Sequence, residues 1–167
     1  MKKRRPSSQE LAAFHEAGHA IVGHLLGWDI DVITIKATGN VHGYISRHRR
    51  QVVQGVVDFD IHKGEWFYDG PLPDRLALLY AGIVAERLLC MGRRVSLKPI
   101  RLGLDIREAR GITRSLGKEK QIEMLKSAEE HAMNLLSDLQ NWHVLERIAA
   151  KLLEVEALDG PSLRLLF

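Results

Sequence analysis

The segment from residue 11 to 26 constrains the fold most, because its apolar residues recur at intervals of three and four. This spacing predicts an amphipathic helix with one buried face, and Gly27 supplies a stop signal. A serine just before the segment can cap the helix, and Glu10 falls in the first turn, where the helix dipole favours an acidic side chain. The same helix carries the sequence His15-Glu16-Ala17-Gly18-His19.

This five-residue motif has the spacing of a metal site. Residues four apart on a helix lie close to the same face, one turn apart, so the rings of His15 and His19 can reach one ion. A catalytic Zn²⁺ needs three protein ligands and an open position, and it makes a bound water acidic near neutral pH. Glu16 projects beside the pair and can take a proton from that water as general base.

The alternative for the motif is two surface histidines on an ordinary amphipathic helix. Here the surrounding residues are apolar, and they include Ala20, Ile21 and Val22. Titratable groups against a buried face need partners, and a metal ion is one such partner. The neighbours therefore favour the metal site.

The rest of the chain predicts more helices and one small β element. β-branched residues from Asp31 to Ile35 and the stretch from His42 to Ser46 favour a short hairpin, and a further strand could form over 51–57. Helical patterns cover 74–91, 105–116, 118–137 and 142–156. Asp105 is expected at the capping position of its helix and Gly117 at its end. The predicted fold class is α+β, predominantly α-helical.

Composition indicates one globular domain. Of 167 residues, 46% are apolar and 27% charged, and we expect a basic segment over 1–10 followed by a single domain over 11–167. Basic runs at 2–5 and 47–50 carry much of the formal charge of +3. A basic nucleic-acid-binding domain would bind in a salt-sensitive manner without a metal. No aromatic residues are interleaved with these runs, so we expect solvated edges and no nucleic-acid partner.

Cellular location is inferred from three features. Cys90 is the one cysteine, so no internal disulfide can form, as is usual in a reducing compartment. The basic start is not followed by the apolar segment of a signal peptide. No window approaches the roughly 18 to 20 apolar residues of a membrane span. We expect a cytoplasmic protein.

Three further stretches accompany the histidine motif: Ala81-Gly82-Ile83-Val84-Ala85-Glu86, Asp105 to Ala109, and Leu152 to Gly160. With His15 to Val22 they resemble the peptidase domain of the FtsH family, the membrane-anchored, ATP-dependent zinc proteases. The stretches occur in the family's order and span residues 11 to 165. Their combination is far more specific than any one of them.

The resemblance implies a role for each candidate residue. His15, His19 and Asp105 would bind the zinc ion, and Glu16 would be the catalytic base. Glu86 would orient a ligand histidine. Two alternatives stay open: Glu86 as the third ligand, as in another class of zinc peptidases, and Asp105 as a plain helix cap.

The sequence lacks two features of the family and matches it poorly in two stretches. No G-x-x-x-x-G-K-[ST] phosphate loop and no membrane segment is present, so we expect no use of nucleotide. The substrate would be a peptide or an unfolded protein. Residues 98–105 lack the family's Gly- and Ser/Thr-rich approach to the aspartate, and 47–73 match poorly. Family members form hexamers, so a homo-oligomer is one expectation.

Two functions compete on this evidence. The first is an ATP-independent zinc endopeptidase that cleaves unfolded or flexible polypeptide. The second is a non-catalytic adaptor or regulatory module that keeps the peptidase fold and its metal. Glu16 favours the first, because a purely structural zinc site needs no general base and normally has its fourth position closed.

Overall fold

The computed structural model describes residues 4–36, 44–49, 71–91 and 103–167. Its helices are α1 (Ser8–Leu25), α2 (Leu72–Cys90), α3 (Leu104–Ile112), α4 (Lys118–Ser137), α5 (Leu139–Val155) and α6 (Gly160–Arg164), with a 3₁₀ turn η1 (Arg114–Leu116). The strands β1 (Trp28–Thr34), β2 (Tyr44–Arg49) and β3 (Ala157–Asp159) form one sheet in the order β2-β1-β3. The predicted class, α+β with helices predominant, is confirmed.

Helix α1 begins and ends where its sequence signals lie. The Ser7 hydroxyl accepts a hydrogen bond from the Glu10 amide at 3.1 Å, and the Glu10 carboxylate accepts one from the Ser7 amide at 2.8 Å. This reciprocal capping box satisfies two amides that the helix itself leaves free. Gly27 follows the helix with φ +81°, a conformation that favours glycine. The chain then turns directly into β1.

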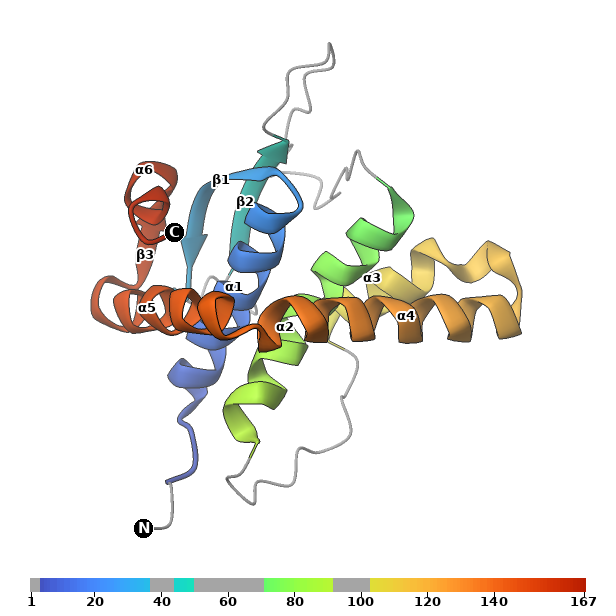
Figure 1. Ribbon diagram of the computed structural model, residues 1–167, viewed down its shortest axis with the longest axis horizontal. Coiled ribbons are helices and arrows are strands. Elements are labelled where there is room, and N and C mark those ends of the chain that lie inside the picture. Colours follow the sequence, from blue (N-terminus) through green and yellow to red (C-terminus); the bar gives the residue numbers. More distant parts are fainter. Residues whose placement is uncertain (1–3, 37–43, 50–70, 92–102) are drawn as a thin grey trace.

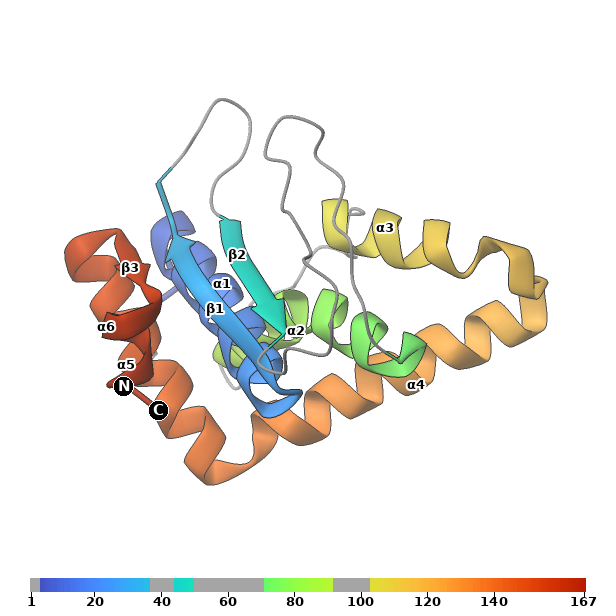
Figure 2. The same cartoon turned by 90° about the horizontal axis from the view of Figure 1, so that it is seen from above.

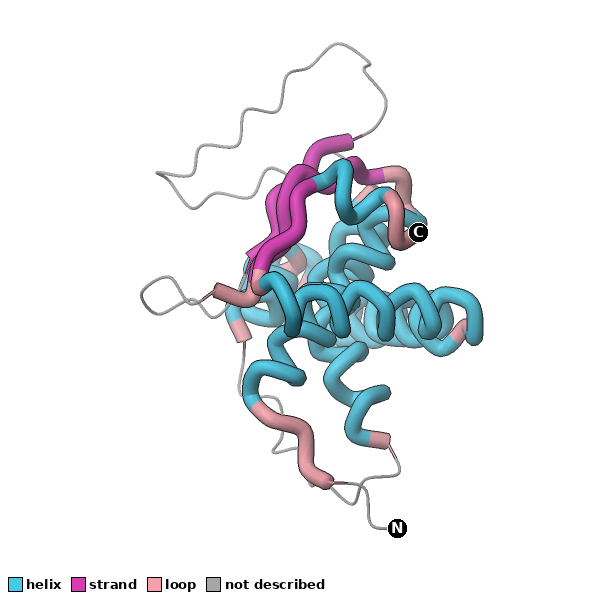
Figure 3. Tube along the Cα trace, turned by 90° about the vertical axis from the view of Figure 1, so that its left-hand side faces the viewer, coloured by secondary structure: helices cyan, strands magenta, loops and turns pink. Residues whose placement is uncertain are grey.

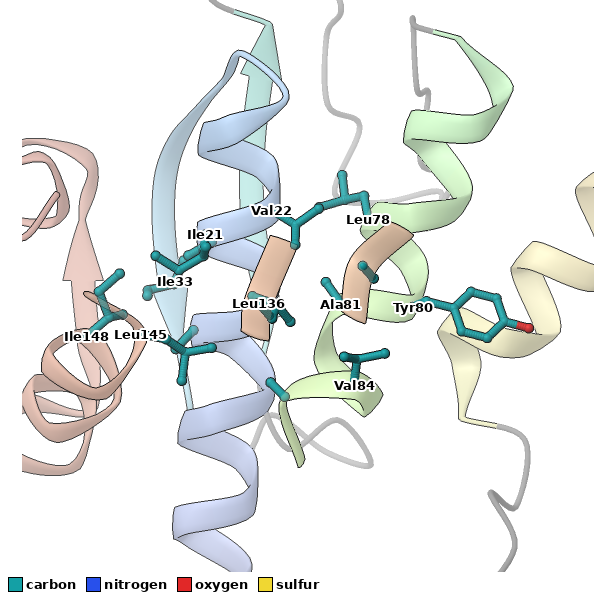
Figure 4. Close-up of a cluster of buried hydrophobic side chains, with 14 of the residues drawn as sticks. Ile21, Val22, Ile33, Leu78, Tyr80, Ala81, Val84, Leu136, Leu145 and Ile148 are labelled. Atoms are coloured by element: carbon teal, nitrogen blue, oxygen red, sulfur yellow. The ribbon is translucent and has the colours of Figure 1, made fainter. Parts of the chain in front are cut away.

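Helix α1 is the central element of the fold. It packs against α2, α5 and β1, and α4 packs against α2. In Figure 1, α4 and α5 run crosswise to α1 and α2. Figure 4 shows the side chains that fill the space between these elements, which come from five of them: Ile21 and Val22 of α1, Ile33 of β1, Leu78, Ala81 and Val84 of α2, Leu136 of α4, and Leu145 and Ile148 of α5.

Helices α1 and α2 approach each other closely at Gly18. A Cβ on this residue would lie 2.7 Å from the carbonyl oxygen of Ala81 and 2.7 Å from the Cβ of Ala85. Both distances are shorter than van der Waals contact, so only glycine fits between the helices. The close crossing lets side chains of α1 reach groups on α2.

The sheet covers one side of the helical body, and its third strand comes from the end of the chain (Figure 3). Strand β1 pairs antiparallel with β2 and β3, and Ile33 stands opposite both Ile45 and Leu158. Ile33 and Leu158 are buried. The Thr34 hydroxyl also donates a hydrogen bond to the carbonyl of Glu156 at 3.0 Å. The predicted hairpin is present, but β3 was not predicted.

Two predicted helices have different boundaries in the structure. The helix predicted over 105–116 ends at Ile112 and is followed by η1, and the Thr113 hydroxyl donates to the carbonyl of Ala109 at 2.8 Å at this junction. Helix α5 starts earlier than predicted, since the Asp138 carboxylate caps it. The strand suggested over 51–57 lies outside the described residues.

The prediction that Asp105 caps its helix was wrong. Gly103 occupies the capping position of α3, and no side chain makes a cap hydrogen bond there. Asp105 lies in the first turn instead. Its carboxylate faces the two histidines of α1, so it is not available to the amides of its own helix.

Candidate metal centre

Three of the predicted residues converge at one point. His15 and His19 lie one turn apart on α1, and Asp105 approaches them from the first turn of α3. Their potential ligand atoms all lie within 4.8 Å of one another. The two histidine Nε2 atoms are 3.1 Å apart, and Asp105 Oδ2 is 3.2 Å from the Nε2 of His15 and 3.6 Å from that of His19.

These separations fit a zinc ion. Zinc bonds of about 2.0–2.1 Å at tetrahedral angles place neighbouring ligand atoms about 3.3 Å apart. The three measured distances, 3.1, 3.2 and 3.6 Å, bracket this value. The donor set of two imidazoles and one carboxylate is also one that zinc accepts in catalytic sites. The residues present therefore suit the ion that the sequence predicts.

The outer nitrogens of both rings are held by acceptors. His15 Nδ1–H donates to Glu86 Oε1 at 2.7 Å, and His19 Nδ1–H donates to the carbonyl of Leu78 at 2.8 Å. A proton on Nδ1 leaves the lone pair of neutral imidazole on Nε2, and both Nε2 atoms turn toward Asp105. Such outer partners commonly fix the orientation of metal-binding histidines.

Glu86 therefore lies on the far side of the His15 ring from the point of convergence. It contacts Nδ1, whereas His19 and Asp105 face Nε2. This geometry suits an orienting partner and does not suit a third ligand. The corresponding partner of His19 was missed by sequence reasoning, because a backbone carbonyl such as that of Leu78 leaves no residue-specific signal.

Glu16 is buried beside the group, at 7% exposure. Its negative charge is one of the interactions that favour the charged form of His15, so the two side chains are electrostatically coupled. The group itself is open on one side. The His19 side chain is 5% exposed, but those of His15 and Asp105 are 24% and 33% exposed. An ion held there would keep a face toward solvent, as a catalytic position requires.

The pKa values of two members move in opposite directions. Burial alone would lower the pKa of His15, but hydrogen bonds to Asp105 and Glu86 outweigh it and raise this pKa to about 10. Burial alone would raise the pKa of Asp105, but the charge of His19 and the hydrogen bond from His15 hold it well below its usual range. In the metal-free protein at neutral pH, His15 is thus a cation next to a carboxylate.

The remaining histidines do not join this group in the part of the chain that the structure describes. The His24 ring stacks on Phe167, with centroids 3.7 Å apart. His143 lies 3.4 Å from a carboxylate oxygen of Glu146 on the same helix. His131 lies on α4 and is not among the clustered metal donors. The side chains of His42, His48 and His62 fall outside the described residues.

Comparison with known proteins gives one informative match. The chain is 29% identical over 193 aligned residues to the ATP-dependent zinc metalloprotease FtsH 2 of Sphaerobacter thermophilus, and the match covers 98% of the chain but 28% of that protein. No family model matches the chain. None of the described helices has the length and apolarity needed to cross a membrane. The match supports a relationship to the FtsH family and to its zinc metalloproteases.

Proposed function

We propose that this chain is a zinc metalloendopeptidase domain that hydrolyses peptide bonds in unfolded or flexible polypeptide without using nucleotide. The observation that carries the proposal is the convergence of His15, His19 and Asp105 at tetrahedral spacing, with Glu16 buried alongside. The similarity to a zinc metalloprotease over nearly the whole chain supports the same reaction class.

Each residue has a distinct task in this proposal. His15 and His19 present Nε2, and Asp105 presents Oδ2, as the three protein ligands. A bound zinc ion would supply Lewis acidity for the scissile carbonyl and the attacking water. The Glu16 carboxylate would accept a proton from the attacking water and return it to the leaving amine. The open side of the group admits the peptide.

The partners of the histidine rings prepare the site before substrate arrives. Glu86 and the Leu78 carbonyl fix both rings through Nδ1, so neither histidine has to reorient during the reaction. The choice of polypeptide substrate rests on the reaction class of the relative. The choice of an ATP-independent reaction rests on the chemistry proposed for the site, since hydrolysis of a peptide bond by an activated water consumes no nucleotide.

The test compares wild type with Glu16→Gln on an unfolded, quenched-fluorescent protein, with zinc loaded and no nucleotide. A general base contributes about 10²- to 10⁴-fold to the rate, so we expect a loss of that size in the variant while bound zinc stays at one per chain. Glu123→Gln, an exposed change on α4, is the matched control and should cleave like wild type.

Two results would contradict the proposal. Full activity in the Glu16→Gln variant would remove Glu16 from the reaction. A wild-type protein that holds one zinc ion and still leaves unfolded substrate intact would favour the non-catalytic adaptor.

A further inference from the structure

Gly82 lies against the ring of His15. A Cβ on this glycine would lie 2.5 Å from the Cε1 and Nε2 atoms of the ring and 2.6 Å from Cδ2. These distances are far shorter than van der Waals contact, so the ring occupies the space that any other side chain would need. Gly82 is also buried in the interior of α2. Glycine is destabilising in a helix interior unless the fold needs the missing side chain.

Gly82 belongs to a row along α2 that contacts both histidines. Leu78, Gly82 and Glu86 are spaced by four residues, so they follow one another along one face of the helix. The Leu78 carbonyl accepts a hydrogen bond from His19, and the Glu86 carboxylate accepts one from His15. Gly82 lies between these two acceptors along α2, and the His15 ring packs against it.

We infer that Gly82 is a positioning residue for the zinc site. Its missing side chain lets the His15 ring lie against α2, so that Nδ1 reaches Glu86 while Nε2 points toward His19 and Asp105. The inference rests on the proposed function, because it assigns Gly82 a part in the same zinc site.

The ring cannot move away from an added methyl group without losing a contact. Rotation toward solvent would break the 2.7 Å hydrogen bond to Glu86, and a sideways shift would displace Nε2 from its 3.1 Å and 3.2 Å neighbours. Loss of an outer partner of a metal-binding histidine typically lowers metal affinity about 10- to 100-fold. We expect a decrease of that size for Gly82→Ala.

Gly82→Ala should change the melting temperature of the metal-free protein much less than it changes the zinc affinity. Alanine is a better helix former than glycine, so the gain in α2 offsets part of the contacts that the displaced His15 ring loses in the metal-free protein. A purely structural glycine would instead make the metal-free protein melt at a clearly lower temperature. The two readouts therefore separate a positioning role from a packing role.

Gly111→Ala is the matched control. Gly111 also lies within a helix, α3, but a Cβ there would meet no atom within 4 Å. This variant tests the same chemical change without contact to the histidine rings. Its zinc affinity should equal that of wild type.

The experiment uses the full chain stripped of metal. Zinc affinity is measured by competition with a chromogenic chelator, ligand geometry by the visible spectrum of the Co²⁺ form, and metal-free stability by thermal melting. We expect Gly82→Ala to bind zinc about 10- to 100-fold more weakly, to show an altered Co²⁺ spectrum, and to melt within a few degrees of wild type. Unchanged affinity together with an unchanged spectrum would overturn the inference.

A second comparison keeps the test decisive if Gly82→Ala does not fold. His15→Ala removes the ring that the new methyl group would meet. Melting of the double variant at the temperature of His15→Ala alone would show that the ring is the obstacle. A double variant that also fails to fold would mean that Gly82 serves helix packing elsewhere, which overturns the inference.

The failure of this inference can be told from that of the proposed function. A wild-type protein that binds no zinc would overturn both. A wild-type protein that binds zinc, alongside a Gly82→Ala variant of equal affinity, would overturn only the role of Gly82.

Discussion

Both ring nitrogens of His15 are engaged, Nδ1 by Glu86 and Nε2 by Asp105 and His19. The two carboxylates stabilise the charged ring and raise its pKa to about 10. In the metal-free protein the additional proton sits on Nε2, on the side where a zinc ion would bind. A metal must therefore displace this proton before it can use the nitrogen.

The first prediction is that zinc binding at pH 7 releases about one proton from His15. Apparent zinc affinity should then rise about tenfold per pH unit from pH 7 to pH 9, since each unit makes the displaced proton tenfold scarcer in solution. Titration calorimetry in buffers of different ionisation enthalpy measures the proton release, and chelator competition measures the affinity.

Glu86→Gln supplies the control for this prediction. The amide keeps the size of the side chain but removes a negative charge next to His15, so the pKa of His15 should fall and the rise of zinc affinity with pH should level off at a lower pH than in wild type. Zinc affinities that level off at the same pH in the variant and in wild type would show that Glu86 does not stabilise the charged ring.

At the scale of elements, the crossing of α1 and α2 is set by small residues. Gly18 touches the backbone of α2 at Ala81, and the acceptors for both histidines lie on the same helix. The separation of the two helices and the geometry of the candidate metal centre are thus coupled, because the two histidines lie on α1 and the acceptors of their Nδ1 hydrogen bonds lie on α2.

The second prediction compares two glycines of α1. Gly18→Ala should lower the free energy of unfolding by about 1–3 kcal/mol, because its Cβ would be 2.7 Å from a backbone oxygen that cannot move alone. Gly23→Ala, whose Cβ would meet neighbours at ordinary distances of 3.7–3.8 Å, should raise it by roughly 0.5–1 kcal/mol. Urea denaturation measures both, and equal effects would contradict the close crossing at Gly18.

Local signals in the sequence predicted most of the helices well. The capping serine and Gly27 bounded α1, and the range predicted for α4 matches the structure. The sequence did not reveal β3, because three residues carry too little pattern to mark a strand and its pairing partner lies near the other end of the chain.

The candidate site shows the same limit on sequence reasoning. The two histidines could be paired from their spacing alone, since four residues make one helical turn. Asp105 and Glu86 could be included only through resemblance to a family, because no spacing rule links residues so far apart. The Leu78 carbonyl could not be found at all, since every residue has one.

At the scale of the whole molecule, the candidate metal centre joins elements that contribute to the hydrophobic core. Its side chains come from α1 and α3, its supports from α2, and α1 also packs against α5 and β1 (Figure 2). A ligand that binds only the folded site should therefore stabilise the entire cooperative unit and not α3 alone.

The third prediction follows from this arrangement. Zinc at 100 times its dissociation constant should raise the free energy of unfolding by about 2.7 kcal/mol, and far-UV circular dichroism and tryptophan fluorescence should report the same shift. Asp105→Ala should lose most of this response, because it removes one ligand from the exposed side of the site. A shift seen by one probe only would indicate that zinc stabilises part of the molecule.

The pairing of β3 with β1 also limits the order in which the elements can fold during synthesis. The chain between β1 and β3 forms a long loop when these strands pair, and closing it costs conformational entropy before the strand contacts compensate for it. Strand pairs this far apart in the sequence therefore form late. During synthesis, α1 and β1 leave the ribosome first, with Asp105 and then Ala157–Asp159 still to come. The two histidines of α1 are therefore made before Asp105, and the sheet that packs against α1 is completed only when residue 159 has emerged.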